Sequence, residues 1–196
     1  PPALIVDNFT AVYGSGDKVT FDLRTNSSIL VTNGNISISV YFKDNDSWVG
    51  TYNCLSGEGW TVNLPVGSYY AIFDTEYAEF QQINRTVTIM PNNTFWALNH
   101  AINANDNSVI NLSNDYYFDS EYDSEFVNGV VINRPITING NGHTIDALQK
   151  ARIFKVTATS INITGLTFKN GKADNGGALY FSNAISNSNI NATYIN

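Results

Sequence analysis

The stretch "INRPITINGNGHTID" (residues 132–146) sets strand-forming residues directly beside residues that normally end strands. Ile136 and Ile138 flank a threonine, which is the alternation expected of a short β-strand. Asparagines and glycines follow at once, and both residue types tolerate the left-handed backbone that tight corners need. The stretch therefore predicts a chain that makes a short strand, turns a corner and makes another strand.

A similar pattern returns as "INITGLTFKN" at 161–170 and, more weakly, as "NAISNSNINA" at 183–192. The copies lie about 22 to 25 residues apart, a period typical of solenoids. With strand candidates at 151–158 and 177–183, each turn holds three short strands, which predicts a right-handed parallel β-helix with asparagines hydrogen-bonded from coil to coil. Alignment of the copies predicts two inward stacks: Ile138, Ile163 and Ile185, and Ile145, Phe168 and Ile190.

Residues 1–91 are organised differently. Ile36, Ile38 and Val40 alternate with polar or aromatic residues, the period of two that a half-buried strand shows. Turn signals such as "TNGN", "KDND" and "SGEG" separate about seven segments of this kind. The first part of the chain is therefore predicted to be an immunoglobulin-like antiparallel β-sandwich.

Pro91 ends the strand pattern and opens a second domain, which we place at 92–196. Phe95, Leu98 and Ile102 then follow at helical spacing, and Asn93 or Thr94 stands where a helix cap is expected. A helix over 94–103 would cover the open core of the first coil, because terminal repeats of a solenoid need caps. We expect Trp96 to plug the end of the solenoid from this helix.

The segments "AINAND…INL", "INRPITINGNGHTID", "ARIF" and "ITGLTFKNGKADNGGALY" resemble a known family, the large adhesin-like surface proteins of methanogenic archaea. "LPVGSYYAIF" (64–73) resembles a segment of bacterial and archaeal immunoglobulin-like surface repeats. The family combines immunoglobulin-like domains with pectate-lyase-like β-helices. The resemblance implies extracellular display at the cell surface and adhesion, and it carries over no binding residues.

Composition excludes several classes of protein. The net charge of −7 argues against binding to nucleic acid, and no apolar run approaches the length of a membrane span. The lone Cys54 cannot form an internal disulfide. Asn-x-Ser/Thr sequons favour an exported glycoprotein, although alternating strands produce such triplets by themselves. They begin at Asn8, Asn26, Asn35, Asn45, Asn84, Asn92, Asn111, Asn162 and Asn191.

Proteins with a β-helix fold often act on polysaccharides, which makes the charged residues of the solenoid candidates for catalysis. Polysaccharide lyases of this fold use clustered acidic residues for calcium and a basic residue that abstracts a proton, and glycoside hydrolases need two carboxylates that face each other across the sugar. The solenoid offers only Asp146 and Asp174, on different coils, with basic residues scattered between them. His143 lies in the "NGHTID" turn, where a structural role is expected. We therefore predict a protein that is not an enzyme.

The segment "NDYYFDSEYDSEFVNG" (114–129) holds the candidate binding residues. Alternating carboxylates would point one way in an extended chain and could bind calcium, or they could form a solvated acidic loop. The tyrosines could stack on sugar rings or anchor a protein partner. The candidate calcium ligands are Asp119, Glu121, Asp123 and Glu125, and the candidate binding tyrosines are Tyr116, Tyr117 and Tyr122.

Three functions remain open: adhesion to a surface protein or glycan of another cell, a polysaccharide-binding module of a β-helix enzyme, and a spacer that lifts a distal binding tip. The chain also stops inside a repeat at Asn196, so we expect a truncated coil. Val156, Phe168 and Ile190 would then be close to water, and the unpaired edge over 178–196 would favour self-association.

Overall fold

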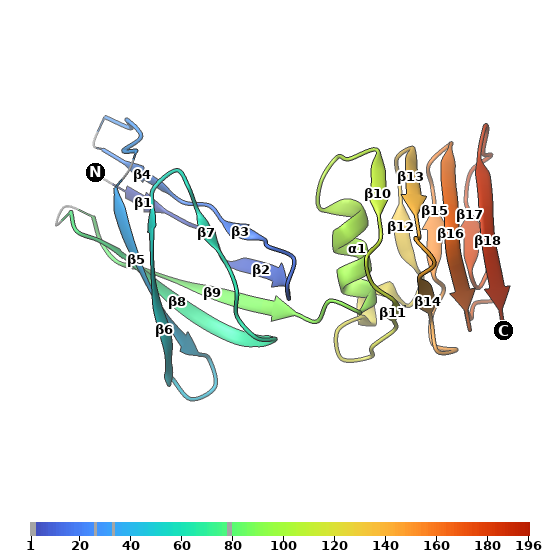
Figure 1. The fold of residues 1–196 in the computed structure, drawn as a ribbon, viewed down its shortest axis with the longest axis horizontal. Coiled ribbons are helices and arrows are strands. Elements are labelled where there is room, and N and C mark those ends of the chain that lie inside the picture. The colour runs from blue at the N-terminus through green and yellow to red at the C-terminus, as the bar shows by residue number, and fades with distance from the viewer. Residues whose placement is uncertain (1–2, 26, 33, 78–79) are drawn as a thin grey trace. The chain divides into compact units, whose positions relative to one another are not determined.

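The computed structural model describes residues 3–25, 27–32, 34–77 and 80–196. The chain divides into two compact units, Pro1–Met90 and Pro91–Asn196, and each is described by itself. Both units are built mainly of β-strands, as the sequence predicts (Figure 1).

The first unit has one large sheet with the strand order β2-β9-β8-β5-β6 and two small sheets, β1-β4 and β3-β7. Residues from the small sheets share one apolar core with the large sheet, which makes the unit a sandwich. The β2–β9 pair is parallel, which corrects the prediction of antiparallel pairing throughout. The strands are β1 (Ala3–Ile5), β2 (Phe9–Val12), β3 (Lys18–Val19), β4 (Asp22–Arg24), β5 (Asn35–Phe42), β6 (Trp48–Leu55), β7 (Trp60–Thr61), β8 (Gly67–Thr75) and β9 (Ile83–Met90).

The alternation of strand β5 places its hydrophobic residues on the buried side of the large sheet. Ile36, Ile38 and Val40 have no solvent exposure, while Ser37 and Ser39 lie on the other side and are partly exposed. Strand β6 lies between the turn signals "KDND" and "SGEG", and it forms the edge of the sheet, where none of its residues is fully buried. An edge strand of this kind lacks the regular hydrophobic alternation that identifies strands in a sequence.

The second unit is a β-solenoid of about three turns, in which each coil pairs in parallel with the next (Figure 1). Strands β10, β13, β16 and β18 stack on one face, β11, β14 and the second half of β16 on another, and β12, β15 and β17 on a third. The bounds are β10 (Val109–Asn111), β11 (Tyr116–Tyr117), β12 (Val130–Ile132), β13 (Ile136–Asn139), β14 (Thr144–Asp146), β15 (Phe154–Val156), β16 (Ile161–Lys169), β17 (Leu179–Phe181) and β18 (Asn189–Ile195).

The predicted stacks are right for two coils and wrong for the last. Ile138 pairs with Ile163, and Ile145 pairs with Phe168. Above them stand Ile190 and Tyr194, not Ile185 and Ile190, and Ile185 is 39% exposed in the connection that precedes β18. The alignment failed because the connection from β17 to β18 is longer than the connection from β15 to β16. The corner within β18 is also shorter than the corner at Thr164–Leu166 of β16. Tyr194 packs on Phe168 with 5.5 Å between the ring centroids, and Phe168 is only 1% exposed. Val156 is also buried. The expectation that these two side chains lie close to water is therefore wrong.

The corner after β13 explains the glycines and asparagines of 139–142. Asn141 and Gly142 adopt left-handed backbone, with φ of 52° and 85°. Gly140 has another role, because a Cβ built there would lie 2.3 Å from a side-chain carbon of Leu166 in the next coil. The Asn139 side chain donates to Asn111 Oδ1 at 2.9 Å, which confirms the expected hydrogen bonding between asparagines of successive coils.

Helix α1 (Phe95–Asn103) begins the second unit and packs against β11 and β12 of the first coil (Figure 1). The Thr94 side chain caps it by accepting from the backbone N–H of Ala97 at 3.2 Å. Phe95, Leu98 and Ile102 are fully buried, as the helical spacing predicts. Trp96 is not a plug of the core: it is only partly buried and stacks on His100 at 5.4 Å.

Candidate functional site

The acidic segment between β11 and β12 is not the extended run on which the calcium prediction rests. It forms a turn and a short 3-10 helix, η1 (Ser124–Phe126). Asp119, Glu121 and Glu125 are exposed, whereas Asp123 is completely buried. The four carboxylates therefore do not share one face, because the turn rotates Asp123 into the protein.

Asp123 fixes the first coil to the cap helix. Its Oδ2 accepts from the backbone N–H of Phe95 at 3.0 Å and of Asp119 at 2.7 Å, and its Oδ1 accepts from that of Trp96 at 2.7 Å. Two of these donors belong to the first turn of α1, which has no helical partner for them. Burial raises the pKa of the Asp123 carboxyl above its usual value, although the three N–H donors act in the opposite direction. Sequence patterns do not predict this role, because the two partners in α1 lie 28 and 27 residues away.

Within the part of the chain that the structure describes, no group of three or more His, Cys, Asp or Glu side chains is arranged to hold a metal ion. The calcium ligand set predicted at Asp119, Glu121, Asp123 and Glu125 is thus not assembled as one cluster. Calcium binding by the exposed carboxylates of this loop stays a prediction.

The three candidate tyrosines have different environments. Tyr116 is 3% exposed and pairs with Ile145 inside the solenoid, so its proposed binding role is corrected to one in the core. Burial raises the pKa of its hydroxyl. Tyr117 is 40% exposed and Tyr122 is partly buried, so these two remain able to meet a ligand.

Two of the candidate catalytic residues of the solenoid, His143 and Asp146, are engaged in structural contacts. His143 Nδ1 lies 3.1 Å from Asp115 Oδ1, which also accepts from the N–H of Thr144, and these contacts lower the pKa of Asp115. Asp146 is buried and lies 3.6 Å from the Lys169 ammonium, and it accepts from the side chain of Asn170 at 2.9 Å. These contacts hold the corners of successive coils together.

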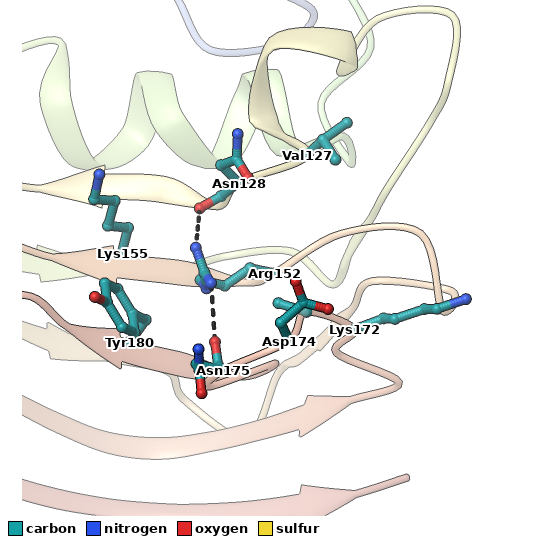
Figure 2. Close-up of a pocket in the computed structure, with 9 residues that line it drawn as sticks. Val127, Asn128, Arg152, Lys155, Lys172, Asp174, Asn175 and Tyr180 are labelled. Atoms are coloured by element: carbon teal, nitrogen blue, oxygen red, sulfur yellow. Dashed lines mark hydrogen bonds between the residues drawn. The ribbon is translucent and has the colours of Figure 1, made fainter.

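An open groove of about 500 Å³ lies along the face formed by β12, β15 and β17, and it brings together basic residues that are scattered in the sequence (Figure 2). All three coils contribute to it, so it runs in the direction in which the coils stack. Its lining consists of Val127, Asn128, Arg152, Lys155, Lys172, Ala173, Asp174, Asn175 and Tyr180.

The side chain of Arg152 is held in place at the centre of this groove by hydrogen bonds. Its guanidinium donates to the backbone carbonyls of Asn128 at 3.1 Å and of Asn175 at 2.9 Å (Figure 2). It also donates to the carbonyl of Gly176 at 3.0 Å, so Arg152 joins three coils. The same guanidinium lies 4.7 Å from the centre of the Tyr180 ring, a distance at which cation–π attraction operates. The positive charge of Arg152 is thus held in one place without a carboxylate partner among the described residues.

Lys155, Lys172 and Asp174 complete the charged lining, and among the described residues none of their side chains has a hydrogen bond or ion pair. Lys155 stands between Val131 and Tyr180 in the register of β12, β15 and β17, on the outward side of the sheet. The repeat spacing could have placed Lys155 beside Tyr180. The position of Lys172 in the groove depends on the conformation of the loop at 170–178, which the repeat pattern of the sequence does not predict.

A family model described as "Putative pectate lyase-like adhesive domain" matches residues 91–196. Its limits coincide with the cap helix and the solenoid. No curated protein matches the chain. No helix of the described residues has the length and apolar character required to span a membrane.

Proposed function

Because the chain belongs to the family of pectate lyase-like adhesive domains, we propose that it is a non-catalytic part of an extracellular surface protein and attaches to a surface protein or glycan of a partner cell. The observation that carries this proposal is the open groove on the third face of the solenoid. The side chains of Lys155, Lys172 and Asp174 have no partner among the described residues, and Arg152 keeps two N–H groups beyond its three bonds to carbonyls, so these groups are available to a ligand.

The arrangement of carboxylates supports a role without catalysis. Hydrolysis of a glycosidic bond needs two carboxyl groups on opposite sides of the sugar. The groove contains a single carboxylate, Asp174, while Asp146 is buried and engaged by Lys169 and Asn170. A groove with this lining can hold a ligand but has no second carboxylate to act on it.

A second candidate function is that of a polysaccharide-binding module within a larger β-helix enzyme, and the groove favours it as well, since a polymer can lie along the coils. The two functions differ in whether the ligand is released unchanged. The adhesin proposal includes an archaeal origin and glycosylation at the exposed sequons. Mass spectrometry of the native protein would test the glycosylation.

The proposal can be tested with beads that carry the chain and with soluble glycans. Attachment of beads to whole cells, without release of a cleaved product, supports adhesion. Glycan binding accompanied by release of product supports the enzyme module. Absence of binding to both cells and glycans would contradict both functions and favour a spacer.

The matched variants for this test are Lys155→Glu with Lys172→Glu, which reverse two charges of the groove, and Lys150→Glu with Lys18→Glu, which change the net charge equally outside it. We expect only the groove variant to lose attachment. Equal attachment by both variants would place the adhesive surface elsewhere.

A further inference from the structure

We propose that the groove formed by Arg152, Lys155, Lys172, Asp174 and Tyr180 binds an anionic glycan, a saccharide that carries carboxylate or sulfate groups. This inference rests on the proposed adhesive function and names the chemical class of its ligand. It follows from three features of the groove: unpaired positive charge, groups suited to hydroxyls, and a shape that spans coils.

The first feature is positive charge without a partner. Three cations and one carboxylate line the groove, in a chain whose net charge is −7. No ion pair among the described residues involves Arg152, Lys155 or Lys172. Elsewhere in the solenoid, Lys169 pairs with Asp146 and Lys150 donates to Ser120. The groove is therefore a local positive site on an acidic protein, and charge complementarity favours an anion.

The Arg152 guanidinium is positioned before any ligand arrives. It uses three of its five N–H donors on backbone carbonyls, so two N–H groups remain for a ligand. The Tyr180 ring supports the guanidinium from one side. Since the side chain is already ordered, a carboxylate or sulfate that binds it costs little conformational entropy.

The remaining lining favours a saccharide over an acidic peptide. The side-chain amides of Asn128 and Asn175 have no hydrogen bond among the described residues, and Asp174 is likewise available as an acceptor. Amides, a carboxylate and the Tyr180 hydroxyl can exchange hydrogen bonds with the hydroxyls of a sugar. Asp174 can accept hydrogen bonds from the hydroxyl groups of a saccharide, and the side chains of an acidic peptide offer no such hydroxyl groups.

The shape of the groove fits an extended chain. Its volume of about 500 Å³ lies within the range of small-molecule sites. It is open to solvent, and its residues come from three successive coils, which are spaced at about 4.8 Å. Figure 2 shows Lys155 and Lys172 on opposite sides of Arg152, so a glycan that meets both lysines crosses the Arg152 guanidinium.

The test is isothermal titration of the full chain with four probes: a hexuronate oligosaccharide, its carboxyl-reduced neutral counterpart, a sulfated disaccharide and a poly-glutamate peptide. We expect binding of at least one anionic saccharide, weakened by salt, and affinity for the neutral counterpart at least about tenfold lower. The hexuronate and sulfated probes show which anionic group the groove prefers. Equal affinity for the neutral sugar, binding of the peptide alone, or no binding of any anionic saccharide would overturn the proposal.

The variants locate the site. Lys155→Gln with Lys172→Gln should lower the affinity about tenfold or more, because two charge-assisted contacts are lost. Lys18→Gln with Lys150→Gln, which change the net charge equally outside the groove, should leave it unchanged. Circular dichroism confirms that both variants are folded. Unchanged affinity in the groove variant would overturn the inference, while attachment to cells without glycan binding would leave adhesion standing and remove only the glycan.

Discussion

Asp123 accepts hydrogen bonds from three backbone N–H groups, two in the distant helix α1 and one in its own loop, so its replacement should affect the stability of the solenoid. Replacement Asp123→Asn keeps the shape but turns an NH₂ group toward one of those donors, which leaves a buried N–H unsatisfied. We expect a loss of about 1 to 3 kcal/mol in the free energy of unfolding. Urea unfolding followed by hydrogen exchange of peptides from α1 measures it.

The control for that variant is Glu125→Gln, which removes an exposed carboxylate from the same loop. It should change the stability by less than about 0.5 kcal/mol. A similar loss for both variants would mean that the loop charge, and not the bond to α1, matters.

Phe168 is enclosed by neighbours on several coils. It pairs with Ile145 below, lies 5.8 Å from Phe154 between ring centroids, and is covered by Tyr194. Phe168→Ala should lower the free energy of unfolding of the solenoid by about 3 to 5 kcal/mol, because it opens a cavity in a packed core. Denaturant unfolding measures the loss, with the outward-facing Val131→Ala as control. A loss under about 1 kcal/mol would refute the observed stack.

At the scale of one element, the corner between β13 and β14 separates two reasons for a glycine. Gly142 has positive φ and open space around it, so Gly142→Ala should cost about 1 to 2 kcal/mol through backbone strain. Gly140 lies against Leu166 and the Gly165 carbonyl, so Gly140→Ala should cost about 3 kcal/mol through overpacking. Thermal unfolding of the two variants compares them. A larger loss at Gly142 would contradict the close approach of the coils.

The loop between β11 and β12 carries the remaining calcium prediction. If Asp119, Glu121 and Glu125 bind calcium, millimolar calcium should raise the melting temperature and a chelator should reverse the rise. Magnesium at the same concentration is the control for ionic strength. An unchanged melting temperature would leave a solvated acidic loop whose buried member, Asp123, serves only the cap helix.

At the scale of the whole molecule, each unit is stabilised by its own core: a shared apolar cluster in Pro1–Met90 and stacked ladders in Pro91–Asn196. Phe168→Ala should therefore lower the urea midpoint of peptides from the solenoid and leave that of peptides from the sandwich unchanged. Hydrogen exchange along a urea gradient resolves the two midpoints. A common shift of both would show that the units unfold as one.

The sequence by itself determined the class of the fold, because periodicity is a local property. The alternation of Ile36, Ile38 and Val40, the helical spacing of Phe95, Leu98 and Ile102, and the matched pairs Ile138–Ile163 and Ile145–Phe168 all follow from side chains that must face one core. The Ile185 register failed where a longer connection broke the repeat.

Only the tertiary structure decided the roles of individual polar residues. A short turn rotates Asp123 away from Asp119 and Glu125 into the cap helix, and stacking of coils brings Arg152 to carbonyls more than 20 residues away on either side. Neither the burial of Asp123 nor the contacts of Arg152 can be predicted from sequence periodicity, because both depend on where loops of irregular length rejoin the solenoid. Strand periodicity could therefore predict the scaffold, but the groove is created by contacts between coils.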